Sequence, residues 1–345
     1  MNHRWQKIKQ ILPKTKYLAI EIGTLIISIL KDMDRASLLI LVAACLILSC
    51  ENAHRNLPLQ ASETFLVVLG IAQDAGYPQI NCEKSCCARV WPQPHLGKMV
   101  TSLGIVDLDQ GKHWIIDATP DFKDQWQYLK EHWNTELAGV FLTHAHMGHY
   151  TGLMQLGREA LGGDRVPVYA MPRMRKYLES NGPWDQLVSL ANIDLQSLQS
   201  DSAVALGSQL SITPVLVPHR DEYSETVGYR IKGKVFSSLF IPDIDKWEKW
   251  ELDIREEIMK VDVALIDGSF FQNGELPGRD MSTIPHPFVT ESMHLMKGLD
   301  PIQKSKVHFI HFNHTNPLLQ EQSEAYTVVM QEGFQVAKQG TVYPL

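Results

Sequence analysis

Histidine is the residue type with which this sequence is best equipped to do chemistry. Three of its fourteen histidines, His144, His146 and His149, lie within six residues at the end of an apolar run. As a chain leaves a strand, side chains two residues apart point to one side, and a turn brings a third ring back towards them. Three imidazoles that meet at one place suit a borderline metal such as zinc. The spacing therefore predicts a metal site and not a set of unrelated surface histidines.

Short apolar segments alternate with helical patterns along most of the chain. The predicted strands are 65–70, 102–108, 113–118, 137–144, 166–170, 208–219, 227–233, 234–243, 261–267 and 306–312. Helices are predicted over 122–133, after Gly152, after Pro172 and near 246–260. No internal repeat or linker divides this region. We therefore expect one α/β domain, built on two sheets, over 64–345.

Composition and charge exclude several classes of protein. The chain has 345 residues, of which 44% are hydrophobic and 21% charged, so it can fill a core and is neither disordered nor of low complexity. After residue 50 it carries 25 basic and 36 acidic residues, a net charge of −11. Nucleic acid is not expected as a partner, because its phosphates require a basic surface. A small-molecule substrate is expected, and the oligomeric state stays open.

Residues 1–49 are predicted to be a signal or anchor segment. The uncharged run 36–49 is short for a membrane-spanning helix but typical of the core of a signal peptide. It ends at Cys50, and the sequence Ile-Leu-Ser-Cys over 47–50 resembles the lipobox of bacterial lipoproteins, which implies lipidation of Cys50. Translation could start at Met1 or Met33, and a plain transmembrane anchor is the alternative. Both interpretations predict a protein of the bacterial cell envelope, held at the membrane and facing the periplasm or the outside, with 50–63 as a tether.

The histidine spacing resembles the signature of the metallo-β-lactamase superfamily, His-x-His-x-Asp-His. This chain reads HAHMGH over 144–149, with Gly148 where the family has aspartate. Three later residues look like the family's third-motif histidine, its metal-bridging aspartate and its last histidine ligand: His219, Asp243 and His311. The resemblance implies an αββα sandwich, in which two mixed β-sheets are flanked by helices.

The resemblance also implies how the ligands are shared. His144, His146 and His219 would supply three neutral nitrogens to one ion and leave a position for water. His149, Asp243 and His311 would hold a second ion, with Asp243 spanning both. Zinc lowers the pKa of its bound water to about 7, so the site is expected to work through metal-bound hydroxide.

Longer stretches are similar to the PqqB branch of the superfamily, the pyrroloquinoline-quinone biosynthesis protein B family. They are 67–82, 115–125, 149–160, 265–275 and 309–317. PqqB proteins lack the first two histidines of the signature and keep its Asp-His pair, whereas this chain has His144 and His146 and lacks the aspartate. We therefore expect a protein that resembles PqqB over most of its sequence but has a metal site more similar to that of the superfamily's hydrolases.

Several other residues near the predicted ligands are also expected to have roles at the metal site. Because Gly148 removes an anionic ligand, we predict a weakened second metal; the alternative is that this glycine makes room for a close approach. His314 is expected to act as a substitute ligand or as the proton donor to a leaving group. Asp117 and Asp267 are expected to orient imidazoles. His286 resembles a residue of a PqqB loop at the rim of the pocket.

Cys82, Cys86 and Cys87 form a separate cluster in a loop rich in turn residues. The PqqB branch has a comparable cluster that binds a structural zinc, although its spacing differs. Here such a zinc would need His95 or another residue as the fourth ligand. A disulfide from Cys82 to Cys86 or Cys87 is the rival prediction, because an exported domain meets an oxidising compartment.

Three functions remain open at this point. The leading hypothesis is an exported hydrolase of an ester, phosphodiester or amide that uses one or two Zn²⁺ ions, with Asp243 and His314 in catalysis. The second is a PqqB-like non-haem iron oxygenase, in which His149, Asp243 and His311 hold Fe²⁺. The third is a metal-binding protein without catalytic activity.

Overall fold

The computed structural model describes residues 63–345, which lie in one compact unit that begins at Ser62. The predictions for the segment 1–49, for lipidation of Cys50 and for nearly all of the tether 50–63 lie outside the described residues. Within residues 63–345, no helix has the length and apolar character needed to cross a membrane.

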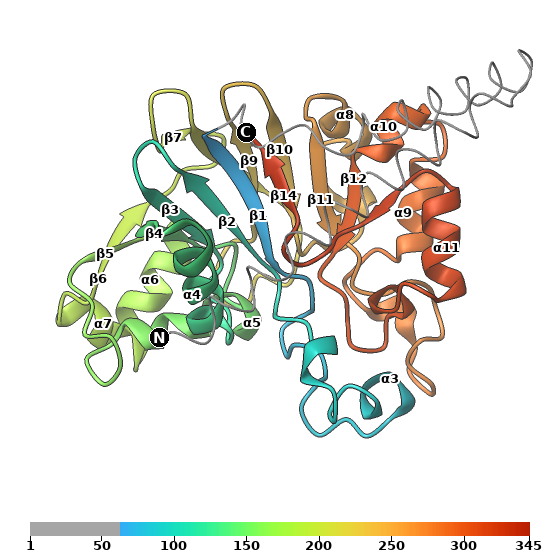
Figure 1. Ribbon diagram of the computed structural model, residues 1–345, viewed down its shortest axis with the longest axis horizontal. Helices are drawn as coiled ribbons and strands as arrows, with labels where there is room; N and C mark the ends of the chain where they lie inside the picture. The colour runs from blue at the N-terminus through green and yellow to red at the C-terminus, as the bar shows by residue number, and fades with distance from the viewer. Residues whose placement is uncertain (1–62) are drawn as a thin grey trace, which may run out of the picture. The chain divides into compact units, whose positions relative to one another are not determined.

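Two seven-stranded sheets form the centre of this unit (Figure 1). The first sheet has the order β14-β1-β2-β3-β4-β5-β6. Its strands are β1 (Thr64–Gly70), β2 (Ser102–Asp107), β3 (Lys112–Ile116), β4 (Glu136–Phe141), β5 (Val166–Ala170), β6 (Ile193–Ser197) and β14 (Val342–Pro344). Neighbours from β14 to β3 are antiparallel, and neighbours from β3 to β6 are parallel.

The second sheet repeats this mixed arrangement in the order β13-β12-β11-β10-β9-β8-β7. Its strands are β7 (Val204–Ala205), β8 (Ser211–Leu216), β9 (Val227–Lys232), β10 (Ser237–Ile241), β11 (Val263–Asp267), β12 (Val307–Ile310) and β13 (Gln335–Val336). Strands β7 to β10 are antiparallel, and β10 to β13 are parallel. The parallel halves matter for function, because side chains that follow parallel strands collect at one edge of a sheet.

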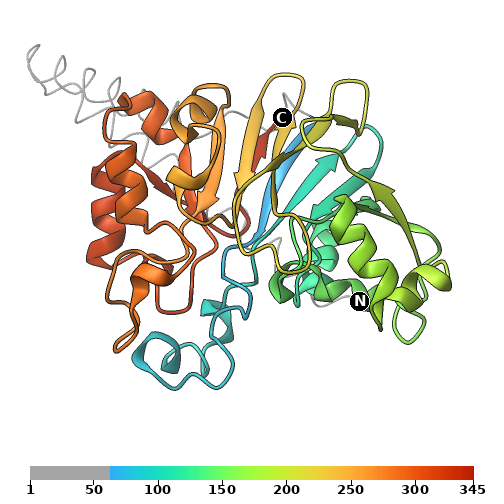
Figure 2. The ribbon, with the colours of Figure 1, turned by 180° about the vertical axis from the view of Figure 1, so that it is seen from behind.

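Helices cover the outer face of each sheet (Figures 1 and 2). On the first sheet these are α4 (Phe122–Trp133), α6 (Pro172–Ser180) and α7 (Trp184–Ser189), whose apolar side chains share one buried cluster with the strands. On the second sheet they are α8 (Ile254–Met259), α9 (Val289–Leu295) and α11 (Glu324–Gln331), with the short α10 (Pro301–Ser305) beside β12. The expected fold, two mixed β-sheets flanked by helices, is confirmed.

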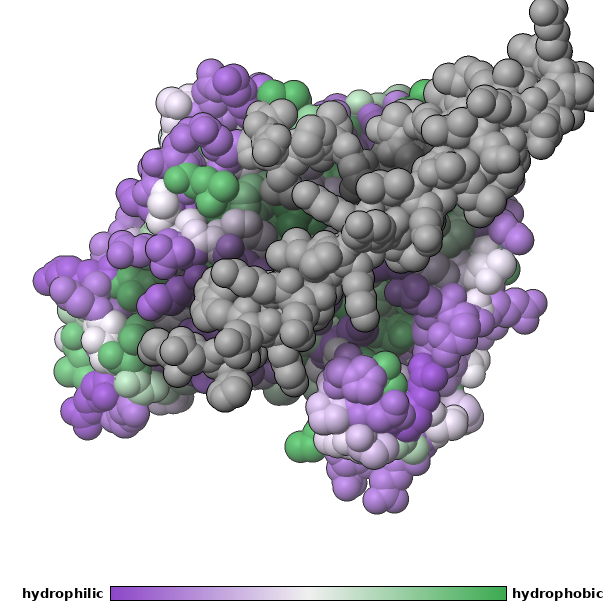
Figure 3. Space-filling view, in the orientation of Figure 1, coloured by the Kyte–Doolittle hydropathy of each residue, from purple (hydrophilic) through white to green (hydrophobic). Residues whose placement is uncertain are grey.

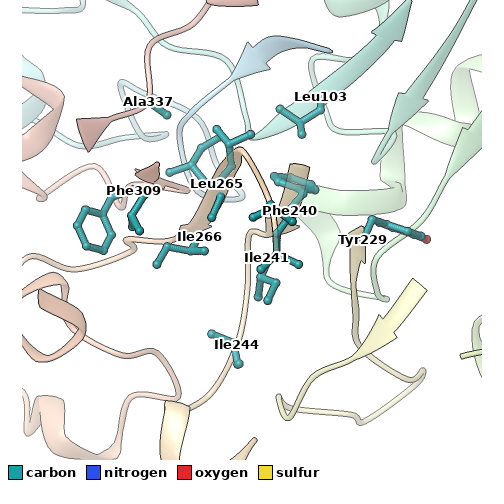
Figure 4. Packing of buried hydrophobic residues seen from close by; sticks show 14 of the residues in the cluster. Leu103, Tyr229, Phe240, Ile241, Ile244, Leu265, Ile266, Phe309 and Ala337 are labelled. Atoms are coloured by element: carbon teal, nitrogen blue, oxygen red, sulfur yellow. The ribbon is translucent and has the colours of Figure 1, made fainter. Parts of the chain in front are cut away.

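The space between the sheets is filled by the largest apolar cluster (Figure 4). Along β1, Leu66 and Val68 point into this cluster, while Phe65, Val67 and Leu69 point towards the helices. This alternation follows from the two-residue period of a strand and explains why β1 reads as an unbroken apolar run. Full burial of such side chains stabilises the fold by about 1.5–3 kcal/mol each, which fixes the strand ends against one another.

Two predicted helices are wrong in type or extent. The segment 246–260 contains only a 3-10 turn at Trp247–Lys249 and the short α8, because Trp247 and Trp250 turn inward to join the core. Where a helix was predicted after Gly152, the chain forms a 3-10 helix that begins just before this glycine, over Thr151–Leu156. Strands β6, β7, β13 and β14 were not predicted, because they are short or partly polar.

Residues 71–98 leave the first sheet as a projecting lobe that carries α3 (Ser85–Ala88) (Figures 1 and 2). The lobe has a small core of its own, in which Tyr77, Cys87 and Val90 are buried. Its outward face is mostly hydrophilic (Figure 3).

Candidate metal centre

The predicted metal ligands meet where strands of both sheets end. His144, His146 and His149 follow β4, with His149 on the one-turn helix α5 (Met147–Tyr150). The other three ligands come from the second sheet and follow β8, β10 and β12, respectively: His219, Asp243 and His311. Strands far apart in the sequence thus deliver their polar ends to one place while their apolar parts stay in the core.

One group of potential ligands consists of His144, His146, His219 and Asp243. Asp243 Oδ2 lies 3.3 Å from His144 Nε2, and Asp243 Oδ1 lies 3.2 Å from His219 Nε2. His146 Nδ1 is 2.9 Å from His144 Nε2. One nitrogen from each ring and a carboxylate oxygen therefore surround a common point.

A second group adjoins the first through Asp243. Asp243 Oδ2 lies 3.8 Å from His149 Nε2 and 3.9 Å from His311 Nε2. The same two rings form a metal-sized group with Asp74, whose Oδ1 is 3.3 Å from His149 Nε2. The structure thus brings all six predicted ligands together. It places two further potential ligands beside them: Asp74, which was not predicted, and His286, which forms a metal-sized group with Asp243 and His311.

Several of the atoms that face one another in these groups lack hydrogen-bond partners. Within the described part of the chain, buried atoms without such a partner include Asp74 Oδ1, His149 Nε2, His219 Nε2, Asp243 Oδ1 and His311 Nε2. Buried polar atoms almost always have a hydrogen-bond partner, so several buried atoms without one at the same place need an explanation. Imidazole nitrogens and carboxylate oxygens are ligands that zinc accepts, and the residues therefore fit a divalent metal.

Asp117 holds His149 and the histidine loop in place. Its Oδ2 lies 2.7 Å from His149 Nδ1, and it accepts hydrogen bonds from the backbone N–H (2.8 Å) and hydroxyl (2.9 Å) of Thr143. Asp117 is fully buried and has a φ of 70°, a conformation that side chains other than glycine seldom adopt. Such strain is typical of functional sites.

Ser269 and Asp267 hold His311 in place in a similar way. Ser269 Oγ is 2.9 Å from His311 Nδ1, and Asp267 accepts a 2.8 Å hydrogen bond from the Ser269 backbone N–H. Asp267 Oδ2 also lies 2.8 Å from His286 Nδ1, which in turn lies 3.1 Å from Asp243 Oδ1. His286 is therefore buried against the ligands, nearer to the centre than the rim position expected for it. His311 shares the strained backbone of Asp117, with a φ of 68°.

Burial and mutual repulsion shape the charges of the site. Burial lowers the pKa of His144 well below its ordinary value, and it lowers the pKa of His311 to about 3. Burial also opposes a charge on His149, but Asp117 and Asp74 outweigh it and raise the pKa of His149 well above its ordinary value. Neutral imidazoles are the form that binds a metal, so most of the cluster is ready to act as ligands.

The site opens on the side of Asp74 and His146. Their side chains are 27% and 13% exposed, whereas those of His144, His149, His219, Asp243 and His311 are at most 2% exposed. Solvent therefore reaches the cluster from the side where these two residues lie.

The cysteines form a second candidate metal site. Cys82, Cys86 and Cys87 lie with His314 within the reach of one ion, and His314 Nδ1 is 3.4 Å from Cys87 Sγ and 3.6 Å from Cys86 Sγ. The three cysteines are free, and 3.8 Å separates Cys82 Sγ from Cys86 Sγ, far more than the 2.03–2.05 Å of a disulfide. The structure therefore contains no disulfide among these three cysteines, and the disulfide stays an untested alternative to the metal site. His95, suggested as the fourth ligand, is exposed.

This position of His314 corrects its expected role. The chain turns between Asn313 and Asn316, whose backbone N–H donates to the Asn313 carbonyl (2.8 Å), and it carries the His314 ring to the thiols of the lobe. A ring nitrogen in that position faces the cysteine thiols, so the structure groups His314 with the cysteines and not with the ligands of the histidine centre. His286 is the histidine that lies beside the ligands.

Comparisons with known proteins agree with this geometry. The model of the β-lactamase superfamily domain matches residues 113–312. The chain belongs to this superfamily. The coenzyme PQQ synthesis protein B of Xanthomonas axonopodis pv. citri is 25% identical over 301 residues, which are 80% of this chain and 98% of that protein. The predicted resemblance to the metallo-β-lactamase superfamily and its PqqB branch is confirmed.

Two solved structures show the same fold. Zn²⁺-bound PqqB from Methylobacterium extorquens superposes with a TM-score of 0.68 at 23% identity, covering 81% of this chain and all of that one. A diphosphatase from the PhnP family gives a TM-score of 0.57 at 23% identity, over 81% of this chain and 96% of that one. The residue groups of this chain and its membership of the superfamily together support a divalent metal.

Proposed function

We propose that this chain is a metal-dependent hydrolase that cleaves a phosphodiester or related phosphoric ester bond at the histidine centre. The observation that carries the proposal is a pair of adjoining ligand groups, one of His144, His146, His219 and Asp243 and the other of Asp74, His149 and His311. Asp243 Oδ2 lies within 3.9 Å of His149 and His311, and both groups contain buried nitrogen and oxygen atoms without hydrogen-bond partners. Pairs of metal ions are typical of enzymes that displace groups at phosphorus. The fold shared with a diphosphatase favours the phosphoric ester over the amide.

The residues of the site divide into ligands, supports and a substrate group. His144, His146 and His219 would hold one ion, and His149, His311 and Asp74 the other, with Asp243 reaching both. Bound divalent ions would supply an acidified water and neutralise charge that develops on the phosphoryl oxygens. Asp117 and Ser269 fix the rings of His149 and His311, so that their other nitrogens stay aimed at the centre.

We assign His286 to the leaving group. Asp267 and Ser269 hold its Nδ1, at 2.8 and 3.2 Å, which leaves Nε2 as the nitrogen that can meet a substrate. A donor in this position would protonate the departing oxygen, the role that the sequence analysis gave to His314.

The test is a metal count combined with a panel of substrates. Protein purified without chelators should contain zinc or a similar redox-inert ion and should hydrolyse phosphodiesters faster than amides or lactams. Iron together with oxygen uptake would favour the PqqB-like oxygenase, for which His149, Asp243 and His311 supply the ligands. Tight metal binding without turnover would favour the catalytically inactive binding protein.

We also propose that the domain acts outside the cytoplasm of a bacterium, anchored at the membrane through lipid on Cys50. The support is the signal-like run 36–49 and the Cys that ends it. Expression of the full chain with Cys50→Ser should release an unlipidated, soluble protein into the periplasm. Continued membrane attachment of that variant would favour a plain transmembrane anchor.

A further inference from the structure

We infer that Asp74 takes the place of the aspartate missing from the histidine motif and is a ligand of the second metal ion. The inference rests on the proposed metal-dependent function but concerns only which residues bind the metal. It replaces the prediction that Gly148 leaves the second site weak.

The space around Gly148 supplies the first argument. A Cβ built on Gly148 would lie 2.5 Å from the Cα and 2.9 Å from the Cγ of Asp74, and still closer to Asp74 Oδ1. Real Cβ atoms do not approach other heavy atoms so closely. Gly148 is not among the glycines with positive φ, so its backbone would tolerate a side chain. Glycine is therefore required at position 148 because atoms of Asp74 fill the space of a Cβ, and not because of the backbone torsion angles of Gly148.

The contacts of Asp74 supply the second argument. Its Oδ1 lies 3.3 Å from His149 Nε2 and belongs to one metal-sized group with His149 and His311. This oxygen is buried and has no hydrogen-bond partner among residues 63–345, and the facing nitrogens of His149 and His311 are also without one. A carboxylate oxygen aimed between two unpartnered imidazole nitrogens has the chemistry of a zinc ligand.

The backbone around Asp74 explains why it is held firmly although it lies in a loop. Ala72 pairs with Phe312 in an isolated parallel bridge, and the Phe312 N–H donates to the Ile71 carbonyl (2.8 Å). The Gln73 N–H donates to the Phe312 carbonyl, also at 2.8 Å. The segment that carries Asp74 is therefore joined to the residue that follows His311. A link between the two sheets fixes Asp74 and His311 relative to each other.

Removal of the carboxylate from position 74, and its addition at position 148, test the inference. In Asp74→Ala and in the near-isosteric Asp74→Asn, the second ion should bind at least about 10-fold more weakly, since support residues alone change metal affinity by that much. Gly148→Asp by itself should gain no metal and should lower thermal stability, because its side chain would overlap Asp74.

Metal content and affinity are measured by elemental analysis and chelator competition, so the result does not depend on activity. Cobalt substitution provides an internal control, since the sulfur-to-cobalt absorption of the cysteine site should stay unchanged in every variant. Asp245→Asn is the matched charge control, because Asp245 lies two residues from Asp243 but pairs with Lys249 (2.8 Å). It should bind metal as the parent does.

Two results would overturn the inference. They are unchanged metal affinity in both Asp74 variants and a gain of metal in Gly148→Asp. A failure of the proposed hydrolysis would instead show as absent turnover with an unchanged metal count.

Discussion

Replacement of Asp117 by asparagine should weaken metal binding, although Asp117 is not one of the predicted ligands. Asp117 accepts three hydrogen bonds, two from Thr143 and one from His149 Nδ1. Asparagine keeps one acceptor oxygen but presents an NH₂ donor in place of the other. If Oδ1 still accepts from the Thr143 backbone, the new donor faces His149 Nδ1–H, and the ring must turn or change its tautomer.

The expected magnitude follows from this loss. Removal of a residue that orients a metal-binding histidine lowers metal affinity by about 10- to 100-fold, or about 1.4–2.8 kcal/mol. The metal-free protein should also lose about 1–3 kcal/mol of stability, because a buried hydrogen bond is broken. The two effects are separable, since the metal contributes to unfolding free energy only through its binding constant.

The assay is urea unfolding of parent and Asp117→Asn, each with and without a fixed excess of zinc. The increment due to zinc should be about 1.4–2.8 kcal/mol smaller in the variant. Asp107→Asn is the matched control: Asp107 is also buried and accepts from Gln110, but it lies at the opposite end of β2 from the site. It should lose stability and keep the full zinc increment. An equal increment in the parent and Asp117→Asn would refute the role assigned to Asp117.

Three further predictions follow from the structure. His314→Ala should release the metal of the cysteine cluster and lower thermal stability, yet leave the metal content of the histidine centre unchanged; loss of metal from both sites would contradict the separation. His286→Ala should lower kcat strongly for a phosphodiester with a poor leaving group and far less for a nitrophenyl ester, and equal losses would exclude it as a proton donor. Burial lowers the pKa of His113 to about 4, so between pH 6.5 and pH 4 the unfolded chain binds a proton at this residue and the folded chain does not. Between pH 7 and 5 the parent should therefore lose about 2 kcal/mol more unfolding free energy than His113→Gln, and parallel pH profiles of stability would contradict this.

The predictable part of the fold comes from patterns that act within a few residues. The apolar runs at 65–70, 102–108 and 261–267 are strands because their β-branched and aliphatic side chains suit a surface buried on both faces. Short or partly polar strands such as β6 and β14 were missed, because what decides their pairing is a neighbouring strand and not their own composition.

The histidine motif was predictable for the same reason. His144, His146 and His149 follow one strand, so local geometry alone brings their rings together. The family resemblance then pointed to His219, Asp243 and His311, each after a strand of its own.

Only the tertiary structure decided the roles of Asp74 and His314. Asp74 reaches the centre because the end of β1 is bridged to the residue after β12, a contact between two sheets that no local pattern encodes. His314 stands only three residues beyond His311, but the turn after Asn313 directs it to cysteines more than two hundred residues earlier in the chain. Such neighbours depend on how two separately formed sheets stack. The chain by itself therefore determines which residues can bind metal, and the packing of the sheets determines which of them share an ion.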